Sequence, residues 1–276
     1  MTPHVYAILA TAIVSLVSLS GVGLLSLGEA RVRQWLTIFV SFSTGALLGN
    51  VLLHMLPEMA ENAETFHRSL MIMLGGIVAS FVIEKMIHWH HCHHVDHHHV
   101  HPVGILTLIG DGLHNIVDGM LIGSTFLISI PLGISTTLAV ALHEIPQEIG
   151  DFSILLHSGF TRSRALLLNL LSACTAIGGA MVVLLTYETF PNIIDWILPF
   201  AAGNLLYIAG VDLLPELHKE ARFKEAVLQL LALVAGIGVL SVLSANTEHA
   251  HEEEVHSTDH TVEEDGHIAE DADHEQ

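Results

Sequence analysis

Long apolar runs alternate with short polar stretches along the chain. Each run has the length of about 17 to 25 residues that a helix needs to cross a bilayer. The pattern predicts an all-α integral membrane protein, with eight transmembrane helices in one domain over residues 1–245. Residues 1–4 carry no Lys or Arg, so we expect the first run to remain as a span and not to act as a signal peptide. The predicted spans are 5–27, 34–56, 70–87, 103–122, 132–157, 164–187, 196–215 and 226–244.

The fifth run is apolar enough to span a membrane, yet it carries several ionisable side chains. At 3.6 residues per turn, His143, Gln147 and Asp151 lie along one line of the helix, and Glu144 and Glu148 lie along the next. An ionisable side chain at bilayer depth costs about 2.5–3.5 kcal/mol on insertion scales. The helix therefore needs a compensating ligand, and a bound cation is the simplest one.

Pro146 lies in the middle of this polar stretch. Because proline has no N–H, it cannot donate the helical hydrogen bond to the carbonyl of Leu142. We therefore expect a kink and a free carbonyl beside the polar side chains, as in helices that are broken at the binding sites of membrane carriers.

The fourth run supplies a second polar face. Asp111, His114, Asn115 and Asp118 are spaced at i, i+3, i+4 and i+7, which places them on one side of a helix. A single membrane histidine is explained by a hydrogen bond to a neighbouring carbonyl. Two helices that each carry His and carboxylate at this spacing predict a cation site between them. Imidazole together with carboxylate and amide oxygens suits Zn²⁺ and Fe²⁺ better than Ca²⁺ or Mg²⁺.

The basic residues predict the orientation, because Lys and Arg are retained on the cytoplasmic side of a membrane. Eight of the nine basic residues lie in or beside odd-numbered loops, which are therefore expected inside. With eight spans, both termini are then outside. The eight are Arg31, Arg33, Lys85, Arg162, Arg164, Lys219, Arg222 and Lys224, and the exception is Arg68.

Two distant segments resemble one another. Residues 53–58 read Leu-His-Met-Leu-Pro-Glu and residues 211–216 read Val-Asp-Leu-Leu-Pro-Glu, with Gly45 and Gly203 at equal distances upstream. The predicted helices run in opposite directions, and the fourth and fifth runs show a similar relation. The pattern favours an inverted repeat of three, two and three helices, an architecture in which the site lies between the halves. Leu-Pro-Glu also ends membrane helices by chance, and that alternative stays open.

Composition separates the body from a tail. The chain is 51% hydrophobic and 14% charged, with a mean hydropathy of +0.57. Residues 246–276 contain twelve of the 29 acidic residues, six histidines and no Lys or Arg. We expect a disordered extracytoplasmic tail that either concentrates cations or only keeps the protein soluble. No Walker A pattern and no soluble domain are present, so no nucleotide, nucleic acid or organic cofactor is expected.

Residues 88–101 contain nine histidines and Cys92. A His-rich tract is a recognised metal-binding composition. Because the orientation places it in the cytoplasm, we interpret it as a segment that receives or senses a metal ion.

The sequence His-Asn-x-x-Asp-Gly at residues 114–119, followed by His-Glu-x-Pro-x-Glu-x-Gly-Asp at 143–151, resembles the ZIP (Zrt-, Irt-like) divalent metal transporters. The resemblance covers about residues 1–245. It implies an eight-helix homodimeric carrier, not an enzyme, in the cell membrane. Such a carrier moves zinc, or iron, manganese or cadmium, into the cytoplasm through a two-metal site. The residues implied are His114, Asn115, Asp118, His143, Glu144, Gln147 and Glu148.

Gln147 departs from the pattern of the branch that the chain resembles, which usually has a second histidine there. A neutral oxygen in place of an imidazole weakens the selectivity of the second metal position. The same residue argues against an intramembrane zinc metalloprotease, because it replaces the second histidine of His-Glu-x-x-His. A cation-efflux carrier is a further alternative. Carriers of the diffusion-facilitator type have six spans and a soluble cytoplasmic C-terminal domain, whereas this sequence predicts eight spans and a short outside tail.

Other polar residues have two readings each. His54 and Asp212, which the repeat matches, could line the two ends of a path or lie at the membrane interface. Asn169 could reach the site or bond a neighbouring helix. The glycines expected to allow close helix packing are Gly75, Gly76, Gly178 and Gly179.

Overall fold

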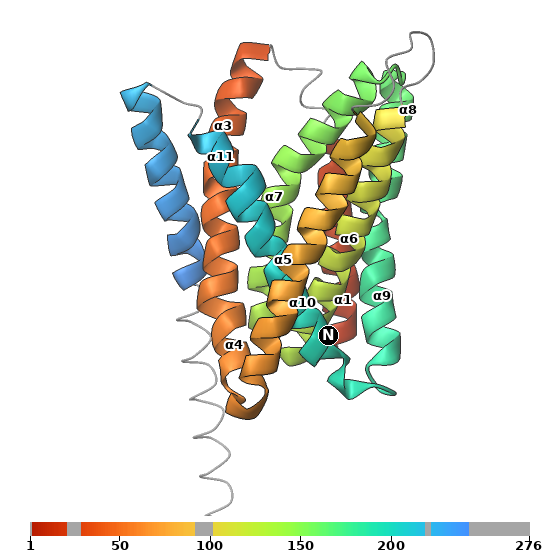
Figure 1. Cartoon of the computed structure of the whole chain (residues 1–276), viewed down its shortest axis with the longest axis vertical. Helices are drawn as coiled ribbons and strands as arrows, with labels where there is room; N and C mark the ends of the chain where they lie inside the picture. Colours follow the sequence, from red (N-terminus) through yellow and green to blue (C-terminus); the bar gives the residue numbers. More distant parts are fainter. Residues whose placement is uncertain (1, 21–28, 92–101, 219–221, 243–276) are drawn as a thin grey trace, which may run out of the picture.

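The computed structural model describes residues 2–20, 29–91, 102–218 and 222–242, which form a bundle of long helices (Figure 1). The His-rich stretch lies outside these residues except for its first four positions, where helix α5 continues to His91. The acidic tail lies wholly outside them. The expectations for the His-rich stretch and the tail therefore stay predictions.

The bundle consists of α-helices joined by short turns and, within two long helices, by π-helical turns. In chain order the elements are α1 (Pro3–Val17), η1 (Ser18–Ser20), α3 (Glu29–Asn50), η2 (Val51–Met55), α4 (Leu56–Ala60), α5 (Ala63–His91), α6 (Pro102–Ile128), α7 (Ile130–His157), α8 (Arg162–Ala173), α9 (Thr175–Thr186), η3 (Pro191–Ile193), α10 (Ile194–Tyr207), η4 (Ile208–Leu213), α11 (Leu214–Leu217) and a last helix Phe223–Val242.

Within the described residues, seven helical stretches are long and apolar enough to cross a membrane. The chain is thus an all-α, multi-pass membrane protein. Helix α7 is also long, with 28 residues, but it is not one of the seven. It carries the polar stretch around Pro146, which lowers its hydropathy. The count of eight spans and the outside position of the termini stay predictions. In Figure 1 the N-terminus and the far end of Phe223–Val242 lie at the same end of the bundle, as an even number of passes requires.

The segments matched as a repeat have the same local structure. A π-helical turn, η2 or η4, directly precedes the Leu-Pro-Glu of each. Neither Pro57 nor Pro215 can donate to the carbonyl four residues earlier, so the ladder of hydrogen bonds is rearranged at the same place in both helices. The α4 end of the first helix and the α11 end of the second lie at opposite ends of the bundle (Figure 1). These observations favour the inverted relation over chance similarity.

Glycines bring helices of the two halves into close contact. A Cβ atom at Gly45 would collide with the carbonyl of Leu233, and one at Gly203 with the carbonyl of Met73. The matched glycines therefore pack α3 against the last helix, and α10 against α5. Gly76 and Gly179 are also packed on backbone, as expected. The expectation was wrong for the remaining two glycines, because a Cβ at Gly75 or Gly178 would meet nothing within 4 Å.

Helices α6 and α7 lie side by side in the centre of the bundle. Helix α6 also packs against α1, α9 and α10, and α7 packs against α1 and α3. The predicted span 164–187 corresponds to the apolar stretch Arg162–Thr186, within which α8 ends and α9 begins around Cys174. This surrounding layer of apolar helices shields the polar faces of α6 and α7 from lipid.

Candidate metal centre

The polar faces of α6 and α7 point toward each other. Asp118, His143, Glu144 and Glu148 are each at most 1% exposed. The side chain of His114 is 12% exposed. Burial of so many ionisable groups among apolar helices requires that they compensate one another or hold an ion.

Four donor groups from the two helices form a first cluster, the His cluster: His114, Asp118, His143 and Glu144. The two Nε2 atoms of the histidines are 3.1 Å apart. Nε2 of His114 is 3.4 Å from Oδ2 of Asp118 and 3.3 Å from Oε1 of Glu144. The corresponding distances from Nε2 of His143 are 3.2 and 3.5 Å.

These separations match the edges of a zinc tetrahedron. With zinc–ligand distances of about 2.0–2.1 Å, ligand atoms in a tetrahedral site are about 3.3–3.4 Å from each other. Five of the six separations in the His cluster range from 3.1 to 3.5 Å. Two imidazole nitrogens and two carboxylate oxygens are a donor set that suits zinc.

A second cluster, the carboxylate cluster, consists of Asp111, Glu144 and Glu148, each buried. Glu144 belongs to both clusters. Oδ1 of Asp111 accepts hydrogen bonds from the side-chain amides of Asn115, at 2.9 Å, and Gln147, at 3.3 Å. The amide oxygen of Asn115 makes no hydrogen bond and remains available as a further oxygen ligand.

Several buried oxygens in these clusters lack a hydrogen-bond donor. Within the described residues they include both carboxylate oxygens of Asp118, Oδ2 of Asp111, and Oε1 of Glu144 and of Glu148. Buried polar atoms in folded proteins are nearly always satisfied, and an ionised carboxylate can only accept. The unbonded oxygens are therefore suited to a cation.

Hydrogen bonds outside the clusters hold the ligands in place. Nδ1 of His143 lies 3.2 Å from the carbonyl oxygen of Ala139. Because a carbonyl only accepts, Nδ1 carries the proton and Nε2 presents its lone pair to the His cluster. The carbonyl of Leu142, which Pro146 was expected to leave free, accepts a hydrogen bond from the hydroxyl of Ser43 on α3. The carbonyl that Pro146 leaves unbonded is thus occupied by Ser43 and is not free, and the expected kink stays a prediction.

Two polar residues from other helices reach the site, and a third contacts one of them. Asn169 on α8 donates to the carboxylate of Glu148 and, at 3.2 Å, to its backbone carbonyl, so it both reaches the site and ties two helices together. Asn204 on α10 contacts Nδ1 of His114 at 3.3 Å, and Ser80 on α5 contacts Asn204. Of these, only Asn169 was singled out in the sequence.

The seven residues implied by the family resemblance all lie along the α6–α7 interface. The histidines and carboxylates among them belong to one or both clusters. The two amide residues, Asn115 and Gln147, each donate a hydrogen bond to Asp111. Asp111 was on the predicted face but outside the implied set. His54 is buried and faces Asn50, with Nδ1 3.4 Å from its Oδ1, whereas Asp212 is exposed.

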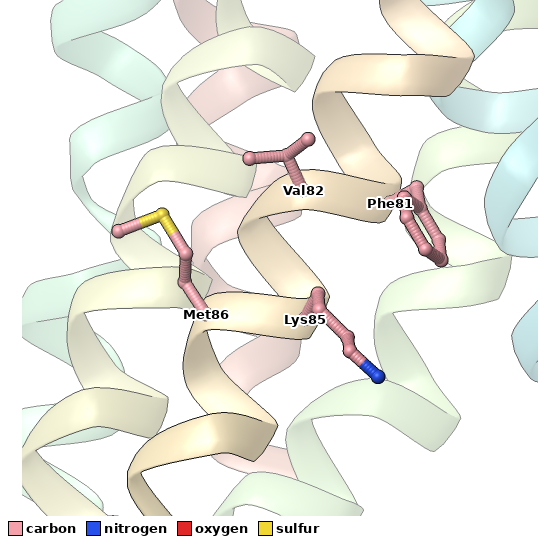
Figure 2. A pocket seen from close by; sticks show the side chains of 4 residues that line it. All are labelled: Phe81, Val82, Lys85 and Met86. Carbon is pink, nitrogen blue, oxygen red and sulfur yellow. The ribbon is translucent and has the colours of Figure 1, made fainter.

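An apolar hollow lies on another part of the bundle, along α5. Phe81, Val82, Lys85 and Met86 line it, and Figure 2 shows all four side chains projecting from neighbouring turns of one helix. Phe81 and Met86 are more than half exposed. None of the four belongs to the two clusters, so this hollow has no part in the metal centre.

A multi-pass helical bundle with buried histidines and carboxylates between two central helices defines a class of membrane protein that handles cations. A family model for ZIP zinc transporters matches residues 1–103 and 90–244, so the chain belongs to that family.

Individual relatives agree with this assignment. The chain is 30% identical to the zinc transporter ZIP13 homolog of Drosophila melanogaster, over 90% of this chain and 91% of that protein. It is 34% identical to zinc transporter ZIP13 of Pongo abelii, over 74% and 66%. It is also 41% identical to zinc transporter SLC39A7 of Homo sapiens, over 52% of this chain and 32% of that one. All three are named as transporters, and none as a protease.

Proposed function

We propose that this chain is a secondary transporter that imports divalent transition-metal ions, zinc in the first place, into the cytoplasm. The membership of the ZIP zinc transporter family supports the substrate class. The observation that carries the proposal is the spacing of 3.1 to 3.5 Å between the donor atoms of the His cluster. In this proposal His114, Asp118, His143 and Glu144 bind the first cation.

A second cation is proposed to bind beside the first, sharing Glu144. Its ligands would be Glu148, the amide oxygens of Asn115 and Gln147, and Asp111. The Gln147 side chain is neutral, whereas the family branch that the sequence resembles usually has an imidazole there, and the carboxylate of Asp111 lies next to Gln147. A site rich in oxygen ligands binds borderline-soft ions less selectively than one with imidazole, so iron and manganese are accepted more readily here.

A transport site must also release its ion. The His cluster is built from single side chains on two helices, and it contains no thiolate. Mixed imidazole and carboxylate ligands hold zinc less tightly than a closed Cys/His structural site. Because imidazoles must be deprotonated to bind a metal, we expect uptake to fall as the pH is lowered.

Direction, membrane and assembly are parts of the same proposal. The distribution of the basic residues supports cytoplasmic odd-numbered loops and outside termini, which orients the carrier in the cell membrane. We propose a homodimer because the family resemblance implies one. Labelling an introduced cysteine near residue 161 from either side of intact cells tests the orientation, and cell fractionation tests the membrane.

The metalloprotease alternative requires a second histidine at position 147. Position 147 is instead a glutamine, whose side-chain amide donates a hydrogen bond to Asp111. This contact gives no support to a protease. The cation-efflux alternative moves the same ions in the opposite direction, so the transport experiment must control the sidedness of the protein.

The experiment is uptake by the full-length protein in liposomes. Zn²⁺, Fe²⁺, Mn²⁺ and Cd²⁺ are offered outside, with the pH recorded on both sides and the protein orientation determined by protease access. We expect Zn²⁺ and Cd²⁺ to enter fastest, through protein molecules whose extracytoplasmic side faces the outside of the liposome. Failure to move any of the four ions contradicts the proposed function, and transport only in the opposite orientation supports efflux.

A further inference from the structure

The two histidines of the His cluster are held differently. Nδ1 of His143 faces a backbone carbonyl, which can only accept a hydrogen bond. Nδ1 of His114 faces the side-chain amide of Asn204, 3.3 Å away, and this amide has both a donating and an accepting end. The proton position on His114 therefore depends on how the amide of Asn204 is turned.

Ser80 decides that orientation. Its Oγ lies 2.9 Å from the carbonyl oxygen of Gly76 and 2.7 Å from the amide atom of Asn204 that is placed as Oδ1, with Nδ2 placed toward His114. A hydroxyl has one hydrogen, so it cannot donate to Gly76 and to an amide oxygen at the same time. Both contacts are hydrogen bonds only if this amide is turned over, so that its NH₂ donates to Ser80 and the hydroxyl of Ser80 donates to Gly76. The two orientations of an amide have the same shape, so its partners decide between them.

In this orientation the amide oxygen of Asn204 faces His114. It accepts a hydrogen bond from the N–H at Nδ1, so the lone pair of His114 lies on Nε2, the atom that points into the His cluster at 3.1 Å from Nε2 of His143. A metal-binding histidine needs this arrangement, because its second nitrogen must donate to an acceptor. Both histidines would then present a lone pair to the cation.

We propose that Ser80 and Asn204 form a relay that positions His114 for cation binding by fixing its proton on Nδ1. The inference rests on the proposed function and deepens it, because it assigns positioning residues on helices outside the α6–α7 pair. Neither residue touches the cation.

Close packing of α5 and α10 places the relay. Gly203, the neighbour of Asn204, lies against the carbonyl of Met73, and Gly76 lies against the carbonyl of Phe200. With no Cβ atoms between them, the two backbones come close enough for Ser80 to reach Asn204. From α10, the side-chain amide of Asn204 also contacts His114 on α6. Cation binding is in this way linked to the position of the α5–α10 pair.

The test compares Asn204→Asp with Asn204→Leu in the full chain, by zinc uptake into liposomes. Aspartate accepts from both His114 and Ser80, so we expect an apparent Michaelis constant within about threefold of wild type. Leucine removes the acceptor, and the apparent Michaelis constant should rise by about 10- to 100-fold, the usual effect of removing a partner of a metal ligand.

A role in helix packing alone predicts the opposite order. Leucine fills the space of asparagine among apolar helices, whereas an unpaired carboxylate is costly there. Leucine equal to or better than aspartate would overturn the proposal. Wild-type protein that moves no zinc would instead contradict the proposed function, and the two failures are thus distinguishable.

A milder pair of variants decides the question if Asn204→Leu does not fold. Ser80→Ala removes the hydroxyl that accepts the hydrogen bond from the NH₂ of Asn204. We therefore expect the apparent Michaelis constant to rise by about three- to tenfold. Ser69→Ala is the matched control, since Ser69 lies on the same helix and donates to the carbonyl of Thr65. Equal kinetics for the two variants would overturn the relay.

Discussion

The His cluster and the carboxylate cluster share Glu144 and lie side by side, but their chemistry differs. The His cluster has two imidazole nitrogens and two carboxylates at near-tetrahedral separations, whereas the carboxylate cluster has oxygen donors alone. Zinc prefers the first kind of site, and harder ions tolerate the second. In the proposed function, selectivity therefore belongs to the His cluster, and the carboxylate cluster accepts a broader range of ions.

The largest effect is expected from Glu144→Gln, because this change removes one carboxylate from both clusters. Zinc uptake by liposomes should fall by at least about 100-fold, beyond the usual cost of losing a ligand's partner. Glu188→Gln is the matched control, since Glu188 is exposed. A variant that keeps half of the wild-type rate would show that the clusters do not act together.

His143→Ala breaks the His cluster and leaves the carboxylate cluster intact. We expect pH-sensitive zinc uptake to be abolished, because the imidazole that must lose a proton to bind the ion is gone. The measurement compares initial rates at about pH 7.5 and about pH 6, on either side of the ordinary imidazole pKa. His157→Ala, at an exposed position of the same helix, should behave as wild type. Retained pH-sensitive uptake would remove α7 from the pathway.

Asp111→Asn tests the carboxylate cluster with the His cluster intact. The amide oxygen of the new side chain still accepts from Asn115 and Gln147, so the helices should keep their packing. We expect the apparent Michaelis constant to rise by about tenfold, and by more for Mn²⁺ than for Zn²⁺, because manganese depends more on carboxylates. An equal loss for the two ions would contradict the division of roles.

The smallest effect is expected from deletion of residues 246–276. If the acidic, His-rich tail concentrates cations at the entrance, the apparent Michaelis constant should rise about two- to threefold while the maximal rate stays constant, because local ion concentration falls. Uptake at limiting zinc measures this. Unchanged kinetics would favour a tail that only keeps the protein soluble.

Much of the fold could be predicted because hydrophobic runs and helix periodicity are properties of the local sequence. The polar faces of α6 and α7 were predicted for the same reason, and the structure brings them together. The π-helical turns and the break at Cys174 depend on local hydrogen bonding that hydropathy does not record. Gly75 and Gly178 differ from Gly76 and Gly179 only in which side of the helix meets a neighbour.

Spacing alone did not assign the supporting residues of the site, although Asn169 was named as one that could reach it. Asn169, Asn204 and Ser80 lie on three further helices, and each is a single polar residue in an apolar run. Nothing local distinguishes a residue that contacts a ligand from one that bonds its own backbone. Asp111 was visible on the polar face, but only the structure places it beside Glu144 and Glu148.

The central claim is that one cation is held by residues of both central helices. Anomalous diffraction at the zinc edge, from crystals of the zinc-loaded full chain, tests it most directly. We predict a zinc peak bonded to Nε2 of His114 and His143 and to carboxylate oxygens of Asp118 and Glu144, at about 2.0–2.2 Å. Zinc bound elsewhere in the protein, with no peak between α6 and α7, would contradict the account.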